Sequence, residues 1–80
     1  PLYARPVAVS IADAQIKAEK YDKAIDTYNA LLKRFPKSAF VYNCLRNVYL
    51  KKGKPDKAKE YEMLLKDAAL YADAGIYGNF

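Results

Sequence analysis

An internal repeat is the feature that most constrains the fold of this chain. Lys20-Tyr-Asp-Lys-Ala24 recurs with one change as Lys54-Pro-Asp-Lys-Ala58, and 54 minus 20 gives a spacing of 34 residues. The apolar pattern follows the same spacing, because Ile11 aligns with Leu45. A period of about 34 residues is typical of helix pairs stacked in series. The sequence therefore predicts an all-α fold, in which antiparallel helix-turn-helix pairs form a short superhelix.

The repeat also divides the chain into segments. At 80 residues the chain is long enough for one small domain, so we expect a single unit. The first repeat is expected over residues 5–38 and the second over residues 39–72. Residues 73–80 are then a C-terminal tail or the start of a third helix pair. This division predicts four main helices followed by a tail.

Start and stop signals place the first two helices. Pro6 suits the first turn of a helix, and the repeat predicts a turn within residues 18–21, because the equivalent position in the second copy is Gly53. Asp22 brings negative charge to the start of the second helix, where free backbone amides favour it. Pro36 ends that helix, since the residue before a proline avoids the helical conformation.

Similar signals bound the third and fourth helices. Ser38 is a natural N-cap for the third helix, and Gly53 is suited to terminate it in a left-handed conformation. Pro55 opens the fourth helix, which we expect to end near Gly75. The remaining residues, 75–80, include two glycines and are expected to be irregular unless something holds them.

Apolar stripes on the helices predict the core. Ala24 and Ala58 end the two copies of the repeated motif, and we expect each to let two helices approach closely. A larger side chain at either position would force the helices apart, at a cost of about 1 to 3 kcal/mol. The other expected core positions in the last three helices are Ile25, Tyr28, Leu31, Leu32, Phe35, Val41, Leu45, Val48, Tyr49, Lys52, Tyr61, Leu64, Leu65, Ala68, Tyr71 and Ala72.

Composition speaks against catalysis. The chain has no histidine, which removes most metal sites and the commonest general base. Cys44 is the only cysteine, so no disulfide can form within the chain, and a thiol nucleophile would lack its usual base. No phosphate-binding loop or paired catalytic carboxylates are present. We therefore expect no enzymatic activity, no cofactor and no metal site.

The ends and the hydropathy of the chain bear on its origin. The chain begins at Pro1 without a charged, apolar targeting segment, and we interpret it as a fragment of a longer protein. A processed terminus or removal of an initiator methionine are the alternatives. No apolar run approaches the roughly 18 residues of a membrane span. The sequence alone does not determine the cellular compartment of the protein.

The residues at fixed positions of the repeat resemble the tetratricopeptide repeat family, over about Arg5 to Ala72. Three positions of the second copy depart from the family pattern, namely Arg46, Glu62 and Leu70. The positions that fit are Ile11, Ala12, Tyr21, Ala24, Tyr28, Leu32 and Pro36 in the first copy, and Tyr42, Leu45, Tyr49, Gly53 and Ala58 in the second.

Residues 30–38 look like bacterial members of the family from envelope-associated lipoproteins and assembly factors. The resemblance implies a bacterial source, with the cytoplasm or the cell envelope (periplasm) as the compartment. It also implies that the first helix of each pair lines a concave groove that binds a peptide or a partner's helix. The expected groove residues are Val9, Asp13, Ile16, Lys17, Asn43, Cys44, Asn47 and Lys51.

Two further surfaces are candidates for partner binding. A basic patch surrounds the second turn, and with the net charge of +5 it could attract an acidic protein or nucleic acid. Nucleic acid is the weaker alternative, because Tyr49 and Tyr61 fall at core positions rather than beside the lysines as stacking platforms. The patch consists of Lys51, Lys52, Lys54, Lys57 and Lys59.

The second surface follows from the number of repeats. At least three repeats are normally needed, whereas only two are complete here. We expect the fourth helix to be covered by the tail or by a second copy in a two-fold dimer. The functional expectation is thus a protein-protein interaction module that serves as a scaffold or adaptor. The alternative is a structural segment of a longer solenoid, or a self-associating module, without a ligand of its own.

Overall fold

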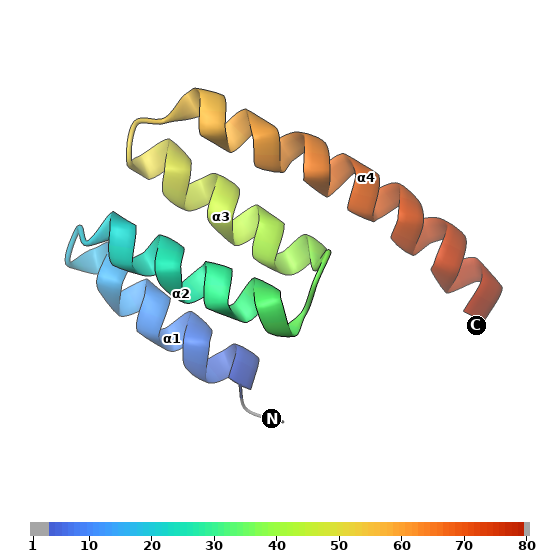
Figure 1. The fold of residues 1–80 in the computed structure, drawn as a ribbon, viewed down its shortest axis with the longest axis horizontal. Helices are drawn as coiled ribbons and strands as arrows, with labels where there is room; N and C mark the ends of the chain where they lie inside the picture. The colour runs from blue at the N-terminus through green and yellow to red at the C-terminus, as the bar shows by residue number, and fades with distance from the viewer. Residues whose placement is uncertain (1–3, 80) are drawn as a thin grey trace.

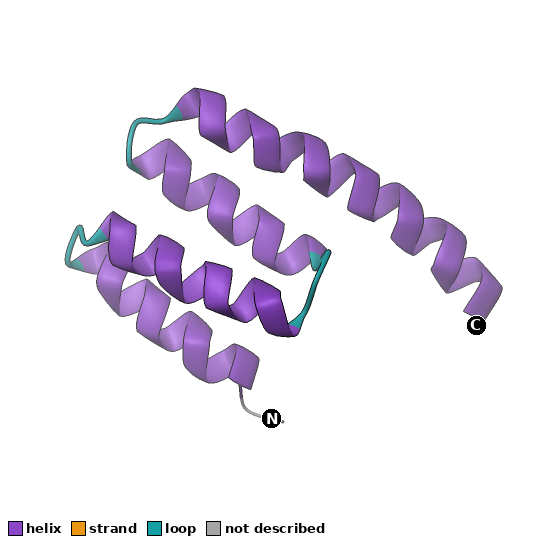
Figure 2. Cartoon of the chain, in the orientation of Figure 1, coloured by secondary structure: helices purple, strands orange, loops and turns teal. Residues whose placement is uncertain are grey.

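The computed structural model describes the backbone of residues 4–79 and the side chains of residues 6–68. The backbone forms helices α1 (Ala4–Lys17), α2 (Tyr21–Arg34), α3 (Ala39–Lys51) and α4 (Pro55–Asn79). Short turns join them, and residues 4–79 contain no strand (Figure 2). Neighbouring helices run antiparallel (Figure 1). The predicted all-α class and the helix pairs are confirmed.

The helices are arranged in chain order. The main contacts are between α1 and α2, between α2 and α3, and between α3 and α4. In Figure 1, α2 and α4 lie nearer the viewer, whereas α1 and α3 lie behind them. The molecule is flat, measuring 42 × 32 × 16 Å along its principal axes. The first helices of both pairs therefore share one broad face and the second helices share the other.

The turns inside the two pairs have the same backbone structure. Glu19 and Gly53, 34 residues apart, both adopt left-handed conformations, with φ of 60° and 82°. In each copy the amide of the next residue donates to the carbonyl five residues back, at 2.8 and 2.9 Å. This hydrogen bond defines the Schellman ending of a helix. The turn predicted within residues 18–21 is confirmed, although a glutamate occupies the position of the glycine.

The connection between the pairs also forms as predicted. Helix α2 ends at Arg34, ahead of Pro36. Ser38 is the N-cap of α3, and its Oγ accepts a hydrogen bond from the amide of Val41 at 3.2 Å. Lys37 takes a left-handed conformation with φ of 63°, which reverses the chain between these helices. Local signals therefore determine where α2 stops and α3 starts.

The core lies where the helices face one another. Ala24 and Ala58 expose 0% and 2% of their surface, as expected for small residues at close helix crossings. The largest fully buried side chains are Leu45, Val41 and Val48 of α3. Helix α3 is the central element, because it packs against α2 on one side and α4 on the other. The buried residues are Ala12, Ala24, Ile25, Tyr28, Leu31, Val41, Tyr42, Leu45, Val48 and Ala58.

Several expected core positions lie at the surface. Phe35 is 39% exposed because it follows the last residue of α2 and leaves the buried face. Lys52 is the C-cap of α3, and its amine forms an ion pair with the carboxylate of Asp22 instead of being buried. Leu64 is 42% exposed. These three predictions are wrong, and Tyr71 and Ala72 lie outside the described side chains.

The predicted end of the fourth helix is also wrong. Helix α4 has 25 residues and continues through Gly75 to Asn79, where an irregular tail was expected. A glycine inside a helix costs about 1 kcal/mol relative to alanine, which is too little to end a helix by itself. The end of α4 extends beyond the other helices (Figure 1).

Candidate functional site

The predicted groove residues come from α1 and α3, the two helices on the far face in Figure 1. Val9, Ile16 and Cys44 are half-buried, and the last two pack against the core cluster. The polar members of the set are exposed, namely Asp13, Lys17, Asn43, Asn47 and Lys51. This face of α1 and α3 thus carries half-buried apolar side chains and exposed polar ones.

Residues from the two repeats meet at Tyr28. Burial raises the pKa of Tyr28, and its hydrogen-bonded neighbour Cys44 and the nearby Asp13 raise it further. Burial also raises the pKa of the Cys44 thiol above its usual 9.0, although the hydrogen bond from Tyr28 opposes this, and the Asp13 carboxylate adds to the increase. Asp13 of α1 and Cys44 of α3 are therefore close enough to act on one another across Tyr28 of α2.

These pKa shifts bear on the chemistry of Cys44. The thiolate is the reactive form of cysteine, and a raised pKa keeps the thiol protonated at neutral pH. Asp13 adds negative charge nearby, which disfavours the thiolate further. Cys44 is therefore unsuited to act as a nucleophile.

Asn43, Asn47 and Lys51 form one exposed ridge along α3. The Oδ1 atom of Asn47 accepts a long hydrogen bond of 3.5 Å from Nη2 of Arg46. Arg46 takes the position that the buried Ala12 holds in the first repeat, and in the described part of the chain its Nε atom is buried without a hydrogen-bond partner. The second repeat thus carries a bulky cation where the first has a small apolar residue.

Ion pairs occupy part of the basic patch. Lys52 pairs with Asp22, and the hydrogen bond from its amine to this carboxylate raises the pKa of Lys52. Nζ of Lys57 lies 3.5 Å from Oε1 of Glu60. All five lysines of the patch are exposed, but the carboxylates of Asp22 and Glu60 partly neutralise the charges of Lys52 and Lys57. The patch is therefore less positive than its sequence indicates.

The tyrosines near this patch contact one another. The rings of Tyr49 and Tyr61 stack with their centroids 5.6 Å apart and an interplanar angle of 14°, and Tyr42 lies 6.3 Å from Tyr61. Tyr42 is buried and the other two are half-buried, which agrees with their predicted packing positions. Since base stacking needs accessible ring faces, this arrangement gives no support to nucleic-acid binding.

A comparison with known protein families identifies the first helix pair. The sequence model of the tetratricopeptide repeat matches residues 9–38. Residues 9–38 form a tetratricopeptide repeat. The four helices are consistent with two such repeats. No curated protein matches the chain, and no solved structure matches it.

The tetratricopeptide repeat gives the class of function. Tetratricopeptide repeats are typically non-catalytic scaffold modules, so the repeat at residues 9–38 indicates a protein-protein interaction module with protein partners. Within the described residues, none of the helices has both the length and the apolar character needed to cross a membrane. The match carries no information about individual binding residues.

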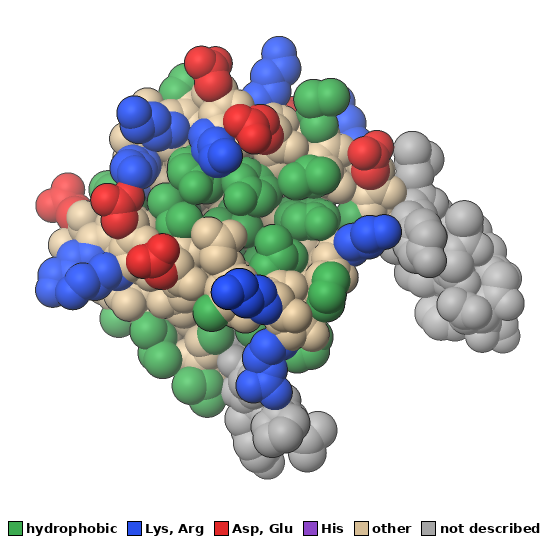
Figure 3. All heavy atoms as spheres, viewed as in Figure 1, with side chains coloured by type: hydrophobic (Ala, Val, Ile, Leu, Met, Phe, Trp, Pro, Cys, Tyr) green, Lys and Arg blue, Asp and Glu red, His purple; other side chains and the backbone are tan. Residues whose placement is uncertain are grey.

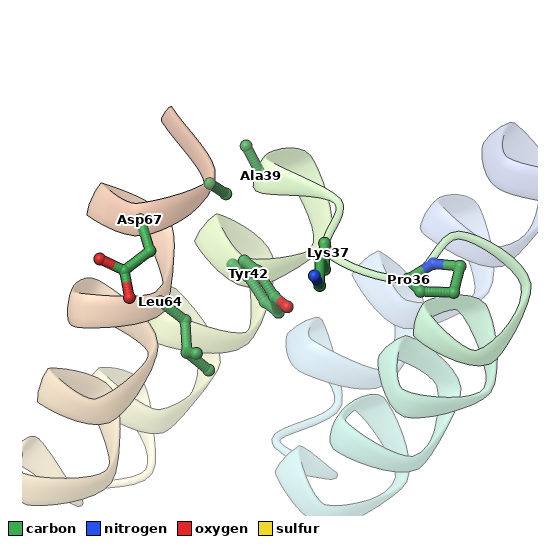
Figure 4. A pocket seen from close by; sticks show the side chains of 7 residues that line it. Pro36, Lys37, Ala39, Tyr42, Leu64 and Asp67 are labelled. Carbon is green, nitrogen blue, oxygen red and sulfur yellow. The ribbon is translucent and has the colours of Figure 1, made fainter. Parts of the chain in front are cut away.

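The second helix pair contains a hollow that the sequence did not reveal. It has a volume of about 610 Å³ and lies between α4 and the start of α3. Leu64 of α4 extends toward Tyr42 of α3 (Figure 4), and Asp67 of α4 and Lys37 of the preceding turn also line the hollow. Side chains of opposite charge thus stand on its two sides. Its existence depends on the separation of two helices, for which the repeat pattern has no signal.

Proposed function

We propose that this chain is a scaffold or adaptor module that binds a peptide or a partner's helix along the face formed by α1 and α3. The supporting observation is that α1 and α3 lie on one face of the molecule, where half-buried Ile16 and Cys44 pack against the same core cluster, so that residues of both repeats belong to one surface. A ligand lying across this surface would contact both helix pairs. It would therefore bind only to the folded, stacked arrangement.

The side chains of this face define the ligand that it suits. Ile16 and Cys44 are half-buried and offer apolar contact, while the side-chain amides of Asn43 and Asn47 can hydrogen-bond a peptide backbone. Lys51, which belongs to both the groove residues and the basic patch, is exposed at the end of α3. The net charge of +5 favours association with acidic sequences. The preferred ligand is an extended or helical segment with apolar anchors and carboxylates.

Peptide selection on the intact chain tests this proposal. Selected peptides are titrated against the unchanged chain, against Asn47→Ala, and against Asp26→Ala as the control on an exposed position of α2. We expect Asn47→Ala to weaken binding by about tenfold, the equivalent of roughly 1.4 kcal/mol, and Asp26→Ala to leave it unchanged. Equal binding to all three chains would place the ligand elsewhere and sink the proposal.

Self-association through α4 is a second candidate. Met63 and Leu64 on α4 are 62% and 42% exposed, so this helix offers apolar surface to a second copy. The tail, residues 73–80, was expected to contribute, but its side chains lie outside the described residues. Sedimentation of the intact chain and of a chain truncated after Ala74 tests the idea. If both remain monomeric with one melting temperature at every concentration, the dimer is ruled out.

A further inference from the structure

The face formed by α1 and α3 carries two equivalent lines of side chains. Positions i, i+4, i+7 and i+11 of a helix lie along one side of it, because an α-helix has 3.6 residues per turn. The members of the two lines are 34 residues apart, and all are exposed except the half-buried Cys44. The line on α1 consists of Pro6, Ser10, Asp13 and Lys17, and the line on α3 consists of Phe40, Cys44, Asn47 and Lys51.

Each line is apolar near the start of its helix and basic at the end. Pro6 and Phe40 stand at the first positions, and Phe40 keeps 42% of its surface exposed. Lys17 and Lys51 are the last residues of α1 and α3. Neighbouring helices are antiparallel, so α1 and α3 run in the same direction (Figure 1). The two apolar residues therefore lie at one end of the face and the two lysines at the other.

The basic end of the face has positive charge to offer a ligand. Two other lysines of the basic patch form ion pairs with carboxylates, whereas within the described residues neither Lys17 nor Lys51 does. The two turns that join α1 to α2 and α3 to α4 lie at this end (Figure 1). Around these turns, residues 17–23 and 51–57 contain seven lysines and three acidic residues. A carboxylate of a ligand is therefore attracted to this end.

The middle of the face disfavours a carboxylate. Burial raises the pKa of the Cys44 thiol on α3, and the carboxylate of Asp13 adds to this increase, so the charge of Asp13 reaches across the face. An acidic residue of a ligand would be repelled here. Asn47, the equivalent of Asp13 on α3, is neutral and can hydrogen-bond the backbone of an extended peptide. A helical ligand would leave this amide less to bind, because its backbone groups are already bonded to one another.

Further helices of the same polypeptide would not cover this face. The helices pack in chain order, so additional pairs before α1 or after α4 would extend the row at its two edges. Residues 4–79 are all used in the four helices and their turns. The opposite face, formed by α2 and α4, mixes side chains of both charges (Figure 3) and does not separate an apolar end from a basic end. The occupant that suits the α1 and α3 face is thus a segment of another protein.

We infer that this face selects an extended acidic segment of a partner protein in which an apolar side chain lies about five residues from a pair of carboxylates. The inference rests on the function proposed above and specifies its ligand. Phe40 and Lys51 are 11 positions apart, which is about 16 Å along a helix that rises about 1.5 Å per residue. An extended segment covers this distance in about five residues of about 3.3 Å each. Its apolar side chain lies against Phe40 and Pro6, and its carboxylates lie between Lys17 and Lys51.

Two capped synthetic peptides of identical composition test this inference on the intact chain. The spaced peptide has a leucine at its first position, aspartates at its sixth and seventh, and alanine and serine between them. The compact peptide has the leucine directly before the two aspartates. Both are titrated into the isotope-labelled chain and followed by NMR. We expect the spaced peptide to bind at least about fivefold more tightly and to shift the resonances of residues 6–17 and 40–51.

Two double charge reversals test the basic end. K17E/K51E should weaken binding of the spaced peptide at least about tenfold, because its carboxylates would then face like charges. K33E/K66E is the matched control, since it changes the net charge equally on α2 and α4. It should change binding by less than about twofold, because salt screens exposed charges outside the face. All four lysines are exposed, so both variants should keep the fold, as circular dichroism would verify.

Phe40→Ala tests the apolar end. It should weaken binding of the spaced peptide about fivefold, because the leucine loses the ring that it contacts. A second spaced peptide, with alanine in place of the leucine, should bind the variant and the unchanged chain equally. Equal losses with both peptides would mean that Phe40 acts on the fold rather than on the leucine, and would overturn its role in selecting the ligand.

The inference is overturned if the spaced and compact peptides bind equally, if the spaced peptide does not bind, or if K33E/K66E weakens binding as much as K17E/K51E. Where one of these results appears while Asn47→Ala still weakens the selected peptides, the face binds a peptide and only the inferred order and spacing are wrong. Where Asn47→Ala has no effect and the shifts lie outside residues 6–17 and 40–51, the proposed function fails together with the inference.

Discussion

The clearest test of the packing compares one substitution at two equivalent positions, Leu45→Ala and Ile11→Ala. Leu45 is 0% exposed, and truncating a fully buried leucine costs about 2 to 5 kcal/mol because transfer and cavity terms add. Ile11 is 48% exposed, so truncation opens no cavity and should cost less than about 1 kcal/mol. The difference between the two variants in the free energy of unfolding should be at least about 1 kcal/mol.

Urea unfolding followed by circular dichroism measures this difference. With an m-value of about 1 kcal/mol per molar urea, Leu45→Ala should lower the midpoint by roughly 2 M or more, and Ile11→Ala by less than roughly 1 M. A domain of 80 residues has a stability of about 4 to 12 kcal/mol, so Leu45→Ala could unfold without denaturant. In that case the comparison is repeated in an osmolyte that favours burial. Equal losses at the two positions would refute the reasoning, since they would mean that Ile11 is as well covered in solution as Leu45.

Three further predictions concern single residues. Ala24→Leu should destabilise the chain by about 1 to 3 kcal/mol in urea unfolding, since Ala24 is 0% exposed between helices, and an unchanged midpoint would contradict the close approach. The raised pKa of Tyr28 means that the folded chain holds the proton of this hydroxyl more tightly than the unfolded chain does. The contribution of the protonated Tyr28 to the free energy of unfolding is therefore complete below about pH 10 and is lost as the pH rises above it. The melting temperature of Tyr28→Phe should therefore fall less steeply than that of the unchanged chain between about pH 9 and 12, and parallel curves would count against the prediction. Glu19→Gly should raise the free energy of unfolding by up to about 1 kcal/mol, because Glu19 has φ of 60°, and a loss in stability would show that its side chain has a role of its own.

The repeat spacing predicted the parts of the fold that depend on local pattern. Ser38 caps α3 and α2 stops before Pro36 because capping and proline geometry act within a few residues. The repeated alanines, Ala24 and Ala58, predicted positions where only a small side chain fits between two helices, and both are buried. The all-α fold class and the helix pairs could therefore be predicted from the repeat spacing together with these local capping and proline signals.

The remaining features depend on which element lies next to which. The period makes Ile11 equivalent to Leu45, but only the neighbouring helix decides that one is exposed and the other buried. The end of α4 was missed because Gly75 is a weak stop signal when the surrounding residues favour a helix. Asp13 and Cys44 were expected on one face, yet the electrostatic effect of Asp13 on Cys44 depends on the distance between α1 and α3, which the sequence does not encode locally.

The identical hydrogen bonds at Glu19 and Gly53 make the two turns interchangeable joints. Both turns end the first helix of a pair with the same backbone pattern, although their side chains differ. A graft of residues 52–55 in place of residues 18–21 should therefore leave the directions of the flanking helices unchanged. When two turns share one backbone geometry, the lengths of the flanking helices determine where each helix pair lies in a stack. The side chains of the turn residues can then differ without changing the direction of the helices.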